Sequence, residues 1–148
     1  MTTKARLFLG AVAGMLVLIA SHPPSAVAQS TQFFPLTPCR AIDTRNMSAP
    51  ILSGGQTRSF SVKGTCGIPV DAKGISYNLT AIGTSQAGFM TMFPHGIVKP
   101  FVASIVFPAR ATLGNGGVVG LTATLPDLSI FLNVGQADAA VDVTGYFK

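Results

Sequence analysis

Three charged residues lie close together in a chain that has few charges. Arg40, Asp43 and Arg45 share one short segment, although charged residues make up only 10% of the 148 residues. Two arginines beside a carboxylate could hold an anionic sugar, or a carboxylate of a partner, through paired hydrogen bonds. Ion pairs that only stabilise a fold produce the same pattern. We expect the structural role, with Asp43 bound to one arginine and the N-terminal segment thereby fixed to the domain; ligand binding is the alternative.

Other residues that could support catalysis or bind a metal ion are few. His95 follows a proline and precedes a glycine, which predicts a solvated turn, and no Gly-x-Ser-x-Gly motif is present. The five acidic residues are all aspartates and are dispersed, so neither a glycosidase-like carboxyl pair nor a calcium loop is apparent. Asn78 and Asp142 fall within strand patterns. We therefore expect no catalytic residue, no metal site and no cofactor.

The first 28 residues have the three parts of a signal peptide. Lys4 and Arg6 precede an apolar or small-residue run over 7–20, and Ala-Val-Ala at 26–28 is a cleavage pattern. A transmembrane helix is the alternative, but it needs about 20 apolar residues, and this run stops before His-Pro-Pro at 22–24. We expect cleavage after Ala28, secretion to the cell surface or beyond, and no membrane span in the mature chain.

Both cysteines belong to the exported part of the chain. Two cysteines in an oxidising compartment predict one disulfide, between Cys39 and Cys66. A zinc or redox site would need further ligands or a Cys-x-x-Cys pair, and the sequence contains neither. We therefore expect a covalent link between these two segments.

The composition favours strands and argues against a nucleic-acid partner. Ten basic residues stand against five acidic ones, and the basic residues of the exported part do not cluster. Few charged residues are available for the polar face of a helix, whereas Gly, Thr, Ser, Val and Phe are abundant.

Short runs of strand-forming residues alternate with turn residues after position 56. They predict an all-β domain over 29–148, a single antiparallel β-sandwich of about 7–9 short strands, with a β-barrel as the alternative. The apolar side chains around 89–107 are expected in the core. The predicted strands are 57–63, 75–81, 89–93, 101–107, 118–125, 128–133 and 139–147; the predicted turns are 83–88, 115–117, 126–127 and 135–138; the expected core set is Phe89, Met90, Met92, Phe93, Phe101 and Phe107.

Several motifs resemble those of a bacterial family of secreted and cell-surface β-sandwich proteins. FPLTPCRAIDTR at 34–45 resembles the opening PLTPCRxxDTR of that family, and DVTGYF at 142–147 resembles its closing DVNGYF. GTCGIP at 64–69, YNLTA at 77–81 and GFMTMFP at 88–94 are similar to its GxCGIP, LNVTA and GFLTLYP. At 109–115 the chain reads ARATLGN, where the family has GQTRANN. The resemblance implies a sandwich, export and surface display, and it implies no activity.

Together these features predict an exported, non-enzymatic module with a structural, adhesive or other interaction role at the cell surface. Its partner would be a surface protein or a glycan, which the sequence does not identify. A carbohydrate-binding module is the first alternative, but Trp is absent and both Tyr77 and Tyr146 fall in strand patterns. A small secreted hydrolase is the second, and it would need His95 beside a serine and a buried carboxylate.

Overall fold

The computed structural model describes residues 30–148. The predicted signal peptide, residues 1–28, and its cleavage site lie outside the described residues. Within the described part there is no helix long and apolar enough to cross a membrane.

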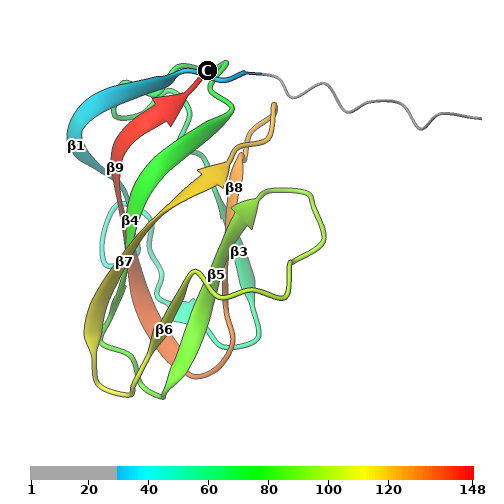
Figure 1. The fold of residues 1–148 in the computed structure, drawn as a ribbon. Coiled ribbons are helices and arrows are strands. Elements are labelled where there is room, and N and C mark those ends of the chain that lie inside the picture. The colour runs from blue at the N-terminus through cyan, green and yellow to red at the C-terminus, as the bar shows by residue number, and fades with distance from the viewer. Residues whose placement is uncertain (1–29) are drawn as a thin grey trace, which may run out of the picture.

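Two antiparallel sheets pack against each other and form the predicted all-β sandwich (Figure 1). The first sheet has the strand order β1-β9-β4-β7, with β2 beside β9, and the second has the order β3-β8-β5-β6. The described strands therefore form two layers and not the barrel kept as an alternative. They are β1 (Phe33–Asp43), β2 (Leu52–Ser53), β3 (Thr57–Phe60), β4 (Gly74–Ile82), β5 (Gly88–Pro94), β6 (Ile105–Phe107), β7 (Thr112–Gly120), β8 (Leu128–Leu132) and β9 (Gln136–Phe147).

The core lies between the two layers and is mostly aliphatic. Successive side chains of a strand point to opposite faces of its sheet, and β4 follows this rule as its sequence predicts. Its alternate residues Ile75, Tyr77, Leu79 and Ala81 are buried, while the residues between them are only half-buried. Strand β9, which lies between β1 and β4, adds the buried side chains of Val141 and Val143. The second sheet supplies the facing side chains Met90, Met92, Leu128, Ile130 and Leu132, all buried.

The Asn-Gly-Gly sequence at 115–117 does not form the predicted turn. It lies in the middle of β7, opposite Tyr77, Asn78 and Leu79 of β4. A Cβ atom on Gly117 would lie 2.7 Å from the phenolic oxygen of Tyr77, so the tyrosine side chain occupies the space that a side chain at 117 would need. The strand predicted at 118–125 accordingly begins earlier, at Thr112, and ends at Gly120.

Two other predicted strands are shorter in the structure. The strand expected at 57–63 ends at Phe60, because the N–H groups of Val62 and Lys63 bind the Asp127 carboxylate instead of continuing the ladder. Of 101–107, only β6 is a strand. The preceding residues form an irregular segment over the second sheet, where the Thr91 hydroxyl donates to the carbonyl of Val102 at 2.6 Å.

Strand β1 was not among the predicted strands, although its motif was singled out. Residues 34–45 supply most of β1, which pairs with β9 at the edge of the first sheet. Pro35 and Pro38 lie in this strand, and an edge strand tolerates the missing N–H of proline. The pairing is interrupted between Pro35 and Cys39 and again between Arg40 and Ile42.

Candidate functional site

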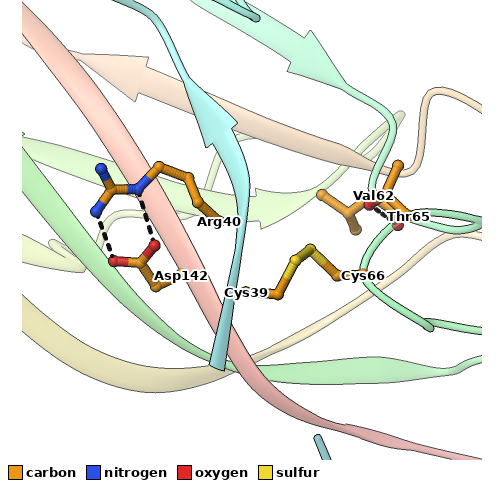
Figure 2. Close-up of a disulfide and its surroundings, with 6 residues drawn as sticks. All are labelled: Cys39, Arg40, Val62, Thr65, Cys66 and Asp142. Carbon is orange, nitrogen blue, oxygen red and sulfur yellow. Dashed lines mark hydrogen bonds and ion pairs between the residues drawn. A yellow bond between two sulfur atoms is a disulfide. The ribbon is translucent and has the colours of Figure 1, made fainter. Parts of the chain in front are cut away.

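Arg40 forms a paired salt bridge across the first sheet. It lies opposite Asp142, because β1 and β9 are neighbours in that register. Its Nε and Nη2 groups donate to the two Asp142 carboxylate oxygens at 2.8 and 2.9 Å (Figure 2). Two parallel charge-assisted hydrogen bonds fix the orientation of both side chains. Asp142, which the sequence pattern places within a strand, is therefore a partner of the predicted charged segment.

Asp43 connects both arginines. Arg45 donates to its two carboxylate oxygens from Nε at 2.9 Å and from Nη2 at 2.7 Å, and the Arg45 backbone N–H donates at 3.1 Å. Arg40 approaches the same carboxylate at 3.4 Å. The hydrogen bond from the Arg45 side chain is the largest cause that lowers the pKa of Asp43, from 3.8 to about 2.

These four residues, Arg40, Asp43, Arg45 and Asp142, form what we call the arginine–aspartate cluster. Asp43 is only 2% exposed, whereas the two arginine side chains are 42% and 46% exposed. Two guanidinium groups face two carboxylates, so the formal charges balance. The cluster connects β1 and the turn after it to β9, and its carboxylates are already bound by arginine donors. The structure thus brings the three predicted charged residues together.

The disulfide lies next to this cluster in the sequence. Cys39 and Cys66 are joined, with their Cα atoms 5.7 Å apart, and the bond closes a separation of 27 residues. Cys66 belongs to a loop in which the Thr65 hydroxyl donates to the carbonyl of Val62 at 2.6 Å (Figure 2). The predicted disulfide is therefore present, and it connects β1 to the segment that follows β3.

Asn78 lies opposite Asp142 on the next strand of the sheet, but the two side chains have separate partners. The Asn78 amide donates to the Thr80 hydroxyl at 3.2 Å, and both Asp142 oxygens accept from Arg40. Among residues 30–148 no three His, Cys, Asp or Glu side chains are grouped so that they could hold a metal ion.

His95 lies in the predicted turn. The prediction of a solvated histidine is only partly correct, because the residue is half-buried. Its Nδ1 atom is 2.9 Å from the Ser59 hydroxyl and 3.2 Å from the Ser129 hydroxyl. The two hydroxyls are 3.3 Å apart. Strands β3, β5 and β8 are adjacent in the second sheet, so residues distant in the sequence meet here. A serine beside a histidine is one part of a nucleophile–base arrangement.

A buried carboxylate lies nearby, but it serves the backbone. Asp127 is completely buried, and its two oxygens accept hydrogen bonds from the N–H groups of Val62 and Lys63 at 3.0 and 2.9 Å. It contacts His95 only through its backbone carbonyl, at 3.3 Å. A catalytic triad needs a carboxylate that orients the imidazole. The Asp127 carboxylate makes no such bond to His95. Sequence reasoning missed Asp127; its place after a turn proline and before a strand was the available signal.

The irregular segment before β6 exposes apolar side chains. Two residues of the expected core set lie elsewhere: Phe101 is fully exposed, and Phe89 is only half-buried. Val98 is 91% exposed. Ile97 and Val102 are also exposed, and we call residues 97–102 the apolar loop. Exposed apolar side chains that gather in one place mark contact surfaces.

Lys99, within this loop, contacts two aromatic rings. Its ammonium group lies 4.6 Å from the ring centre of Phe131 and 5.2 Å from that of Phe101, distances at which a cation is attracted to an aromatic face. A hollow of about 240 Å³ opens beside it, lined by Phe89, Lys99, Pro100, Phe101, Val102 and Ala103. The apolar loop therefore combines exposed apolar side chains with one positive charge, that of Lys99.

Comparison with known proteins assigns the chain to no family and to no known fold. No family model matches it, and neither a curated protein nor a solved structure matches it. The fold and the described residues therefore define an all-β sandwich, and its function has to be argued from its surfaces.

Proposed function

We propose that this chain is an exported, non-enzymatic β-sandwich module that acts at the cell surface as a structural or adhesion protein. The observation that supports this most is the apolar loop. Monomeric proteins rarely leave large apolar side chains gathered on the surface unless a partner covers them, and Phe101 and Val98 are almost entirely accessible.

The chemistry of the loop favours a protein partner over a glycan. A sugar presents hydroxyl groups that need directed hydrogen-bond donors and acceptors, usually beside an exposed aromatic ring. Among residues 97–102 only Lys99 has a polar side chain. Tyr77 is buried, and Tyr146 stacks on Phe34 with the ring centres 5.1 Å apart. An apolar surface on another protein is therefore the partner class proposed here.

The Ser59–His95 contact is the observation that favours the second candidate, a hydrolase. That reading would require an acid to orient the imidazole and donors to stabilise an oxyanion. The carboxylate of Asp127 instead binds two backbone amides. The two hydroxyls and the imidazole are well explained as a polar contact that joins β3, β8 and the turn after β5.

The proposed adhesion through the apolar loop, which we call the attachment role, can be tested with the secreted protein itself. Labelled protein is added to intact cells of the producing strain, and the bound fraction is compared with that of the double variant V98S/F101S. We expect the variant to lose at least about 1.4 kcal/mol of binding, a tenfold weaker affinity. Val70→Ser is the matched control, since Val70 is 76% exposed but lies outside the loop. Equal binding by the wild type and the double variant would contradict the role assigned to the loop.

Two further measurements separate the alternatives. Protease treatment of the cells should remove the binding sites, whereas binding that survives protease and is lost after glycan removal would favour the carbohydrate-binding alternative. Export is tested by sequencing the N-terminus of protein recovered from the medium or envelope, which should begin at or near Gln29. A recovered chain that keeps residues 7–20 would contradict signal-peptide cleavage.

A further inference from the structure

Strand β7 is a long sheet edge without the features that usually protect one. Unpaired backbone groups at an edge can pair with another strand, and proteins block this with charged residues, prolines, bulges or short strands. Strand β7 runs from Thr112 to Gly120 without a charged residue or a proline. Its pairing with β4 is continuous over all nine residues. Figure 1 shows no further strand beyond it in the first sheet.

The other three sheet edges of the described chain are protected. Strand β1 contains two prolines, has two breaks in its register and is held by the disulfide. Strand β2, which pairs with β9, has only two residues. Strand β6 has only three residues and β3 only four. The guanidinium of Arg58, in β3, also binds the carbonyls of Ser48, Ala49 and Pro50. Only β7 therefore presents a long and regular edge to strand addition. Its described side-chain hydrogen bond, from the Asn115 amide to the carbonyl of Ser104 at 2.7 Å, starts from a residue whose backbone pairs with β4.

The contacts of β7 show which of its backbone groups face outward. Just after the strand, the N–H of Leu121 donates to the carbonyl of Lys73 on the β4 side at 2.8 Å. The Val119 carbonyl also points toward β4, because it lies 2.8 Å from the position of a Cβ on Gly74. Backbone groups alternate in direction along a strand, so those of residues 112, 114, 116, 118 and 120 point away from β4. No other described hydrogen bond uses them.

The outward-facing residues are also nearly free of side chains. Three of the five are glycines, at 114, 116 and 120, which carry no side chain that could obstruct an approaching backbone. Beside Gly120 lies the Pro94 ring, 3.5 Å from the position of a Cβ there. Val118 projects its side chain from this set and is 63% exposed. Because the strand has no charge, a second identical strand would meet no electrostatic repulsion.

We propose that β7 pairs antiparallel with β7 of a second copy of this chain, and that the two first sheets join into one sheet across a two-fold axis at Gly116. In this register Gly114 of each copy faces Val118 of the other, so each valine covers the gap that a glycine leaves. Gly116 faces Gly116, and Thr112 faces Gly120. Five outward residues from each copy form about ten inter-strand hydrogen bonds.

This association stops at two copies. An interface in which the same patch meets itself is closed, whereas a chain with two open edges in one sheet would continue into a filament. The opposite edge of the first sheet is β1, which is protected as described above. The proposal is independent of the apolar loop, which lies over the other sheet.

The first test measures molar mass by light scattering or sedimentation equilibrium over a range of protein concentrations. The wild type should reach twice the monomer mass. Val118→Lys should stay monomeric, because a charge on an edge strand opposes pairing, and Val70→Lys should dimerise as the wild type does. Gly116→Pro should also be monomeric and still folded, since the N–H that it removes faces outward. Circular dichroism and a thermal transition confirm that each variant is folded.

The second test reports the register. Directly opposite residues that exchange hydrogen bonds have Cα atoms about 5.5 Å apart, a separation that a disulfide spans. Gly116→Cys should therefore form a covalent dimer under mild oxidation, and Gly120→Cys, which faces Thr112 of the other copy, should not.

Three results would overturn the proposal: a monomeric wild type at every concentration, a dimer that persists in Val118→Lys, or equal cross-linking of the two cysteine variants. The double variant V98S/F101S separates this proposal from the attachment role. It should remain dimeric while losing cell binding, so failure of one does not produce failure of the other.

Discussion

Replacing Asp43 by asparagine tests whether the arginine–aspartate cluster stabilises the fold. Asp43 is buried and accepts hydrogen bonds from the side chain and backbone of Arg45, which hold its pKa at about 2 instead of 3.8. A carboxyl with such a depressed pKa contributes about 2 kcal/mol to the free energy of unfolding at neutral pH. Both arginines are partly exposed, and screening by water reduces this contribution to about 1 kcal/mol. We therefore expect Asp43→Asn to lower the free energy of unfolding by about 1 kcal/mol, measured by urea unfolding of the wild type and the variant at pH 7.

The pH dependence gives the sharper test. Because the pKa is lower in the folded state, the stabilisation is complete above about pH 5 and is lost as the pH falls toward about 2. The difference in unfolding free energy between the wild type and Asp43→Asn should therefore shrink over this range. Asp71→Asn is the control, since Asp71 is 52% exposed and pairs with the exposed Lys148, and it should change the urea midpoint little. A constant difference between the wild type and Asp43→Asn from pH 7 to 2 would refute this reasoning.

Three further changes follow from the described contacts. The double variant C39S/C66S should lower the unfolding free energy by about 3 kcal/mol, measured by urea unfolding, because it releases the loop that the disulfide closes; an unchanged midpoint would argue against that role. Asp127→Ala leaves two buried N–H groups without an acceptor and should cost about 3 kcal/mol in the same assay; a loss below that of Asp43→Asn would contradict it. His95→Ala removes one partly buried contact and should cost about 1 kcal/mol or less, and if the domain hydrolyses any ester, glycoside or peptide, loss of that turnover in the variant would overturn the non-enzymatic proposal.

The strands that could be predicted are those with a defined inner face. In β4 the alternation of apolar and polar residues reflects burial of one face, and local sequence contains that information. Strand β7 lacks it, because its inner face at Gly117 is filled by the Tyr77 side chain of the neighbouring strand. A glycine that makes room for a cross-strand neighbour looks, in the sequence, the same as a glycine in a turn.

The candidate site shows the same division between local and distant information. Arg40, Asp43 and Arg45 could be singled out because they are close in the sequence. Asp142 is 102 positions from Arg40, and only the pairing of β1 with β9 brings the two together. The contact of His95 with Ser59 likewise depends on the order of strands in the second sheet. Side-chain pattern cannot predict such contacts unless the topology is already known.

Phe101 shows most clearly why hydrophobicity alone can give the wrong location, although Phe89 of the same expected core set is also only half-buried. Phe101 lies in the apolar segment 101–107, which reads as a strand covered on both faces, yet only Ile105 and Phe107 are buried there. Polar contacts of the neighbouring strand fix the course of the segment: the Thr91 hydroxyl binds Val102, and the Met92 N–H binds the Ser104 hydroxyl. Sequence periodicity does not report such contacts, so the exposure of Phe101 follows from the structure alone.

The distribution of charge explains why the proposed contact surfaces are apolar. Arg40 and Arg45 bind aspartates, Lys148 binds Asp71, and the Lys63 ammonium binds the carbonyl of Thr122. Most of the few charges in the described chain are thus engaged within the fold, on the side of β1 and β9 or in the loops between the sheets. Strand β7 has no charge, and the apolar loop has only Lys99. Recognition through these two surfaces must therefore depend on apolar burial and backbone hydrogen bonds, which salt screens far less than it screens pairs of exposed charges.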